Sequence, residues 1–139
     1  MRVDMTARDA AVDALIAMSL SPDYHDRADA GVALASLVDS PQAPERLRQL
    51  VLDPDDTVVT RKTVEALTHR GGSAALTVIA AALASADIDR QEWIATGVRD
   101  ALGWADWEWG ERIAACERLP DPSESSRLRG FLLDLRPQG

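Results

Sequence analysis

The sequence has little of several residue types on which whole classes of protein depend. Its 139 residues include one cysteine and two histidines. A single cysteine excludes an intramolecular disulfide and favours a reducing compartment, so we expect a cytoplasmic protein. The two histidines, His25 and His69, lie far apart and do not form the H-E-x-x-H spacing of zinc proteases, so no metal site is predicted.

Motifs for catalysis are also missing from the sequence. It contains neither the G-x-S-x-G pattern of a nucleophile elbow nor a Walker or Rossmann-type glycine pattern. The closely spaced carboxylates of residues 53–56 are not followed by the glycine and glutamate of an EF-hand loop, so helix capping is favoured over calcium binding. Cys116 lies in an apolar run, which is typical of a small buried residue rather than a reactive thiol. We therefore expect no enzyme activity, no catalytic residue and no cofactor.

Charge and hydropathy exclude two further classes of partner. No apolar run approaches the roughly 20 residues that cross a bilayer, and Asp9 and Asp13 interrupt the segment where a signal peptide needs its apolar core. We expect no membrane contact and a first helix that is retained. The net charge of −8 argues against binding the backbone of nucleic acids, which requires clustered Lys and Arg. A basic partner fits this charge, although an acidic surface also serves ordinary solubility.

The composition also limits which residue types can form the hydrophobic core. Aromatic residues make up only 4% of the chain. The interior must therefore consist of Leu, Val, Ile and above all Ala, which lets helices approach one another closely. The length suits a single domain over residues 1–139, large enough to bury most of what the unfolded chain exposes.

The clearest predicted structure is a pair of helices over residues 53–86. Asp56 is a suitable N-cap for the first of them. Four residues recur at three- and four-residue steps on one face of this helix: Thr60, Thr63, Val64 and Leu67. Gly71-Gly72 can end the helix with positive φ, and Ser73 can cap the next one. Residues 74–85 are small or apolar on nearly every side, so this second helix must be sandwiched between neighbours or covered by a partner.

The same pattern recurs along the chain with a period of 33 to 35 residues. Four residues precede the face just described by 33 positions: Arg27, Ala30, Gly31 and Leu34. Gly31 within a helix predicts a close helix crossing. Further helices are predicted at residues 23–38, 44–52, 88–102, 106–119 and 124–135. The predicted repeat units are 21–52, 53–86 and 87–119, between capping helices 5–20 and 123–136, with Thr6 and Ser21 as helix caps and residues 136–139 as a frayed end.

The helix pair resembles a known family. Its D-P-D turn at Asp53, the segment V-T-R-K-T-V-E-A-L ending at Leu67 and the trailing Gly71 resemble HEAT repeats, with weaker matches at residues 21–34 and 87–102. The strings D-P-D-D-T and R-A-D-A-G-V-A-L-A are similar to those of short HEAT-like proteins of actinomycetes. The resemblance implies an all-α, right-handed α-solenoid of about eight helices stacked as antiparallel hairpins. It also implies a protein-binding scaffold, although some HEAT-like proteins are DNA glycosylases, lyases of tetrapyrrole proteins or bacterial immunity proteins.

The tryptophans are the most informative candidate binding residues. All four fall within 17 residues: Trp93, Trp104, Trp107 and Trp109. Trp107 and Trp109 are two apart at a helix start and cannot share one face, so at least one should be exposed. Seven acidic residues surround them against three arginines: Asp87, Asp89, Glu92, Asp100, Asp106, Glu108 and Glu111. Aromatic anchors beside acids favour a hot spot for a basic partner, whereas the alternative is that the tryptophans fill gaps in an alanine-rich core.

Three functional hypotheses follow. The first is a non-enzymatic interaction module or adaptor, for example an immunity or inhibitor protein for a basic toxin. Its partner would dock on the tryptophan segment, with Asp106, Glu108 and Glu111, or on a groove lined by the second helices of the pairs. Tyr24 and His25 form a further candidate cluster, which helix-start electrostatics also explains. The second hypothesis is a HEAT-like DNA glycosylase, disfavoured by the acidic charge, and the third is a homodimer formed through residues 74–85.

Overall fold

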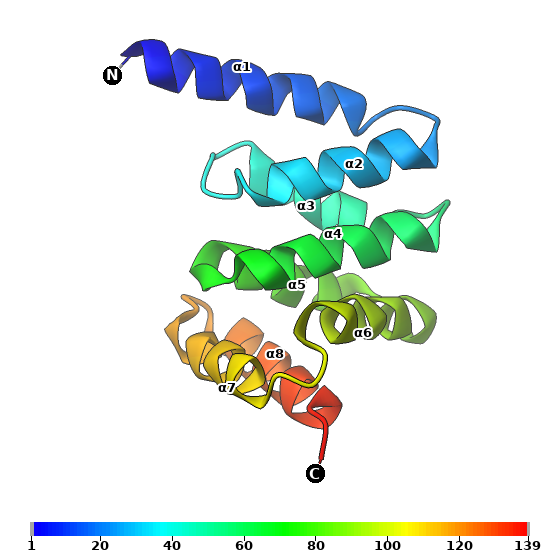
Figure 1. Cartoon of the computed structure of the whole chain (residues 1–139), viewed down its shortest axis with the longest axis vertical. Coiled ribbons are helices and arrows are strands. Elements are labelled where there is room, and N and C mark those ends of the chain that lie inside the picture. Colours follow the sequence, from blue (N-terminus) through cyan, green and yellow to red (C-terminus); the bar gives the residue numbers. More distant parts are fainter. Residues whose placement is uncertain (1, 139) are drawn as a thin grey trace.

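The structure is an all-α fold in two layers. It is a computed structural model that describes residues 2–138, with side chains from Ala7 onward. Over these residues there are eight α-helices, one 3₁₀-helix and no strand: α1 (Arg2–Met18), α2 (Tyr24–Ala35), α3 (Ala43–Val51), α4 (Thr57–Arg70), α5 (Gly72–Ser85), α6 (Ile88–Leu102), α7 (Asp106–Ala115), η1 (Cys116–Arg118) and α8 (Pro122–Leu135). In Figure 1, α1, α2, α4 and α6 follow one another in one layer, and α3, α5 and α8 lie behind them. None of the described helices is both long and apolar enough to cross a bilayer.

Two of the predicted helix starts are confirmed by side-chain caps. The carboxylate of Asp56 accepts a hydrogen bond from the backbone N–H of Val58 at 2.8 Å, and α4 begins at Thr57. The carboxylate of Asp87 accepts one from the N–H of Arg90 at 2.7 Å, and α6 begins at Ile88. Both aspartates satisfy donors that the first helical turn leaves unpaired.

Three predicted caps are wrong. Asp23 caps α2 in place of Ser21, because its carboxylate accepts from the N–H of His25 at 2.8 Å. Ser73 does not cap α5, because Gly71 at φ 62° turns the chain within one residue and the helix begins at Gly72. Thr6 lies inside α1, which already begins at Arg2.

The α2–α4–α6 stack, formed by these three helices, is held close by two glycines. A Cβ atom on Gly31 of α2 would overlap Oγ1 of Thr63 on α4. On the other side of α4, a Cβ atom on Gly97 of α6 would lie 2.8 Å from the carbonyl oxygen of Arg61. The predicted close crossing at Gly31 is therefore confirmed, and a second one occurs at Gly97, 66 residues further along the chain.

Helix α5 is buried between α3 and α8 in the second layer. Its buried residues are Ala75, Leu76, Val78, Ile79, Ala80, Ala82 and Leu83. Of the two expectations for this nearly all-apolar helix, the structure thus shows the sandwiched arrangement along most of its length.

Buried arginines fasten the turns between helices. Arg27 on α2 donates from Nε and Nη2 to the two carboxylate oxygens of Asp53, at 3.0 and 3.2 Å, and from Nη1 to the carbonyls of Ser21 and Pro22. The hydrogen bond with Asp53 raises the pKa of Arg27 above its usual value. Asp53 Oδ2 also accepts from the N–H of Asp56 at 2.9 Å. The capping predicted for residues 53–56 is confirmed at Asp56, and the ion pair of Asp53 with Arg27 was not predicted.

Candidate functional site

The four tryptophans have very different exposures. The side chain of Trp109 is completely buried, Trp93 is half-buried, and Trp104 and Trp107 are 87% and 69% exposed. An exposed tryptophan is unusual, because its indole has a large apolar area that packing normally removes from water. Residues 103–109, which carry Trp104 and Trp107 on the surface, are called the tryptophan corner below.

Helical geometry explains why Trp107 and Trp109 differ. Residues two apart on a helix point about 200° away from each other, so α7 buries one indole and turns the other outward. Trp109 is fixed by a hydrogen bond from its Nε1 to the carbonyl oxygen of Gly103 at 3.0 Å. The prediction that at least one of this pair is exposed is confirmed. Trp109, however, is fully buried, and it positions the corner from inside through this hydrogen bond.

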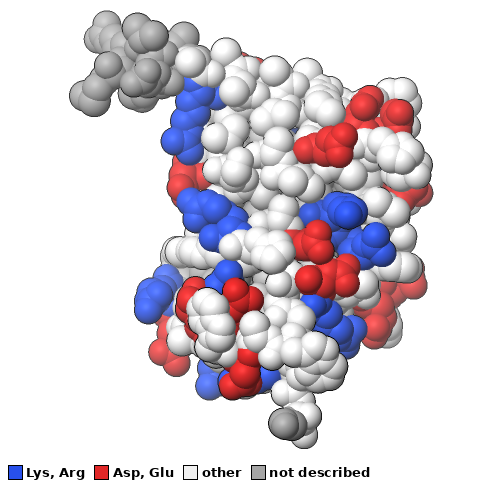
Figure 2. Space-filling model, viewed as in Figure 1, with Lys and Arg blue, Asp and Glu red and all other residues white. Residues whose placement is uncertain are grey.

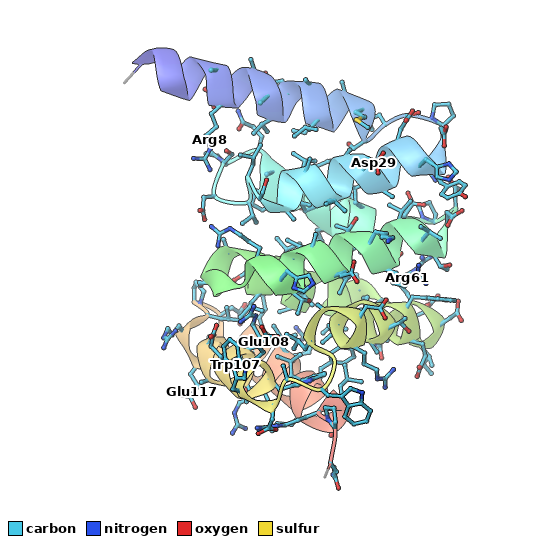
Figure 3. All side chains as sticks on the ribbon, in the orientation of Figure 1. Arg8, Asp29, Arg61, Trp107, Glu108 and Glu117 are labelled. Carbon is cyan, nitrogen blue, oxygen red and sulfur yellow. The ribbon has the colours of Figure 1, made fainter. Side chains whose placement is uncertain are left out.

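Three of the seven acidic residues around the tryptophans are paired with arginines of the chain. Asp106 pairs with Arg136, and Glu111 pairs with Arg112, at 2.9 and 2.6 Å between nitrogen and oxygen. Asp100 lies 3.7 Å from Arg61 of α4, and Glu108 is half-buried. Figure 3 labels Trp107 and Glu108 on α7, and Figure 2 shows basic and acidic side chains interspersed over this face. The local acidic excess expected from the sequence is therefore partly neutralised.

A cavity of about 410 Å³ opens beside Trp104. It is lined by residues of the tryptophan corner and of the C-terminal segment: Trp104, Asp106, Trp109, Pro137 and Gln138. Trp107 is not among these residues. The two exposed indoles therefore have different surroundings, one in a cavity beside a carboxylate and one on the outer face of α7.

The contact of the C-terminal segment with α7 was not predicted. Residues 136–139 are expected from the sequence to fray, but Arg136 donates two hydrogen bonds to the carboxylate of Asp106 and Pro137 is half-buried. Gly139 lies outside the described residues. The partners are 30 residues apart, and an arginine after a helix has no periodic signal that identifies its acceptor.

Arg112 is a second structural residue that the sequence did not single out. Its side chain is buried and donates from Nε and Nη2 to the carbonyl oxygens of Thr68 and His69, at 2.9 and 3.2 Å. These carbonyls belong to the last turn of α4, where no helical donor is available. Arg112 thereby caps α4 from α7 and fixes the helix on which Trp107 lies.

Tyr24 and His25 lie at the start of α2, away from α7 in Figure 1. Their ring centroids are 3.9 Å apart, and Nδ1 of His25 lies 3.2 Å from the carboxylate of Asp23. Both side chains are exposed. The cluster is held by local contacts at a helix start and does not join the tryptophan corner.

A second hollow lies between the helices of the second layer. It has a volume of about 650 Å³, and its apolar floor comes from Ala74, Thr77, Val78 and Ala81 of α5 with Pro44 and Pro120. At its rim Arg70 pairs with Asp39 at 2.9 Å and Arg48 pairs with Glu45 at 2.6 Å. This α3–α5 groove corresponds to the predicted groove along the second helices of the pairs, but its charges are already matched.

The single cysteine is protected from reaction by burial. Cys116 is buried with its thiol donating to the carbonyl oxygen of Arg112 at 3.3 Å, and burial raises the pKa of this thiol to about 11. Such a thiol is almost entirely protonated at neutral pH and is a poor nucleophile. Within the described residues, no three side chains of His, Cys, Asp or Glu gather into a metal-binding group.

Comparisons with known proteins found no relative of this chain. No protein-family model matches the chain, and searches of curated proteins and of solved structures found no similar protein.

Proposed function

We propose that this protein is a HEAT-like helical-repeat module that binds another protein through the tryptophan corner and performs no catalysis. The observation that carries this proposal is the exposure of Trp104 and Trp107, at 87% and 69%. Tryptophan is the residue most enriched at the energetic centres of protein interfaces. Two of the four tryptophans in this aromatic-poor chain lie outside its core. At these positions their side chains contribute little to the stability of the fold.

The arrangement of the helices supports the repeat part of the proposal. α2, α4 and α6 lie in one layer, and their crossings involve Gly31, Thr63 and Gly97 at intervals close to the sequence period. In an α-solenoid each helical pair buries its apolar face only against its neighbours. Such a framework presents extended surfaces and end corners to partners.

The proposed partner is basic. The chain has a net charge of −8, which attracts a positively charged protein over long range and speeds their association. Asp106 and Glu111 are paired within the chain, so we assign long-range attraction to the whole charge and most of the affinity to the indoles. An immunity or inhibitor protein that neutralises a basic toxin is the specific form of this proposal.

Partner capture with matched variants tests this function. Biotinylated protein would be incubated with a lysate of the source organism, and captured proteins would be identified by mass spectrometry. Trp104→Ala and Trp107→Ala should each lose the partner, by at least about tenfold in affinity for a hot-spot residue. Leu20→Ala removes a 65% exposed apolar side chain at another turn and is the control. Equal capture by all four proteins would contradict the proposal.

A further inference from the structure

Asp106 and Arg136 form an exposed ion pair at the edge of the cavity beside Trp104. Nε and Nη2 of Arg136 lie 3.1 and 2.9 Å from the same carboxylate oxygen, Oδ1 of Asp106. Nη2 also lies 3.4 Å from the backbone carbonyl oxygen of Asp106. A guanidinium group of the chain itself thus lies on the carboxylate of Asp106, which is the one that lines the cavity among the described residues.

The cavity has the chemistry of a site for a guanidinium group. An indole face attracts cations, and arginine stacks on it in preference to lysine. The cavity offers the indole of Trp104 next to the carboxylate of Asp106, within about 410 Å³ of space. The side chain of Asp106 is 78% exposed, so an incoming group can reach it from solvent.

We propose that the cavity beside Trp104 receives an arginine side chain of the protein partner, which replaces Arg136 on the carboxylate of Asp106. This inference rests on the proposed function and names the chemical group by which the partner is recognised. Arg136 is the intramolecular stand-in for that group and competes with it. The chain binds more weakly with Arg136 in place than it would without it.

The position of Arg136 makes this exchange feasible. Helix α8 ends at Leu135, so Arg136 lies just beyond the last helical residue and can leave Asp106 without breaking the helix. Exposed ion pairs contribute little to stability, because solvent screens both charges and holding two side chains costs entropy. The partner's arginine gains the indole of Trp104 in addition to the carboxylate.

The test is a titration followed by the indole N–H signals in two-dimensional nuclear magnetic resonance spectra. The probe is N-acetyl-arginine amide, and its uncharged isostere N-acetyl-citrulline amide is the control. Each of the four indole signals is assigned with a Trp→Phe variant. We expect the arginine probe to shift the Trp104 signal in a saturable way and the citrulline probe to leave it in place. The signal of Trp93, which does not line the cavity, should stay unchanged.

Three variants sharpen the titration. Arg136→Gln should bind the arginine probe up to about fivefold more tightly, and Asp106→Asn should bind it about fivefold more weakly. Asp100→Asn removes another partly exposed paired carboxylate, 3.7 Å from Arg61, and should change nothing. The dispersion of the remaining indole signals reports whether each variant is folded.

Several outcomes would overturn the proposal. They are an unmoved Trp104 signal in Arg136→Gln, equal shifts with arginine and citrulline probes, or equal affinity in Asp100→Asn and Asp106→Asn. A shift of the Trp104 signal on concentrating the protein alone would assign the site to a second copy. If partner capture depends on Trp104 but the probe does not bind, this inference fails and the proposed function stands. If the probe binds but capture of no partner depends on the tryptophans, the cavity is a guanidinium site and the proposed function fails.

Discussion

The α2–α4–α6 stack and the tryptophan corner share helix α6 as a boundary but use side chains of opposite size. In the stack, Gly97 lets the backbones of α4 and α6 approach until a Cβ atom would lie 2.8 Å from a carbonyl oxygen. At the corner, a few residues after the end of α6, two indoles extend into solvent. In the stack, small side chains determine how closely the helices pack.

The difference separates the residues that build the fold from those that remain available for binding. The facing sides of the stacked helices are closely packed, and Thr63 is buried there without a hydrogen-bond partner for its hydroxyl. At the corner, Trp109 packs in the interior, whereas Trp104 and Trp107 are exposed and do not take part in that packing. Substitutions in the two regions should therefore have unequal effects on stability.

The largest effect is expected at the buried side of the corner. Trp109→Ala removes a fully buried indole and should lower the free energy of unfolding by about 3–5 kcal/mol. Trp107→Ala, two residues away, should change it by no more than about 0.5 kcal/mol. Urea unfolding followed by circular dichroism measures both. Similar losses of unfolding free energy in the two variants would contradict the burial of Trp109 and the exposure of Trp107 on α7.

Breaking the buried ion pair at the edge of the stack should have the next largest effect. Arg27→Met leaves the buried carboxylate of Asp53 without its partner, and we expect a loss of about 3 kcal/mol. Arg61→Met breaks the more exposed contact with Asp100 and should cost less than about 1 kcal/mol. Chemical denaturation of the two variants, and of Arg27→Met with Asp53→Asn, shows whether the unpaired charge causes the loss. The double variant should recover part of it.

A methyl group added within the stack tests the close crossing directly. Gly97→Ala places Cβ 2.8 Å from the Arg61 carbonyl oxygen and 2.9 Å from Cβ of Val64. Overpacking costs about 1–3 kcal/mol, against about 1 kcal/mol gained from helix propensity, so we expect a net loss of about 1 kcal/mol. Gly130→Ala in α8 meets no atom within 4 Å and should gain about 1 kcal/mol. Thermal melts in which both variants gain stability would refute the tight crossing.

The smallest effect concerns Cys116, behind the corner. Its pKa is raised to about 11 in the folded protein, from about 9 ordinarily. Above pH 9 the unfolded chain loses this proton while the folded protein keeps it, so stability falls as pH rises through this window. At pH 10 the loss relative to pH 7 should be about 1 kcal/mol larger in the native sequence than in Cys116→Ala. Parallel pH dependences for the two proteins would contradict the burial of an ionisable thiol.

Much of the fold follows from the sequence because local patterns specify it. The helical periodicity, the cap at Asp56, the start of α6 at Ile88 and the turn at Gly71 involve residues within a few positions of one another. The crossing at Gly31 was also predicted, since a glycine inside a helix needs a packing reason. The repeat arrangement and the family resemblance stay predictions.

The candidate site is harder to predict, because its properties depend on contacts between distant residues. The sequence places an indole at Trp104 but does not show whether it fills a gap or lies in solvent. Two of the nearby acids, Asp106 and Asp100, find their partners Arg136 and Arg61 in distant segments of the chain, which the local sequence does not show. Charge counted along the chain therefore overestimates the negative potential at the surface.

The cap that Arg112 provides has a mechanical consequence. Its guanidinium group ties α7 to the carbonyl oxygens at the end of α4, more than 40 residues earlier in the chain. A ligand that pulls on Trp107 and tilts α7 would withdraw those donors and loosen the turn at Gly71, where α5 begins. Binding of a partner at Trp107 should therefore speed amide hydrogen exchange near Gly71, where the chain passes from the first layer to the second.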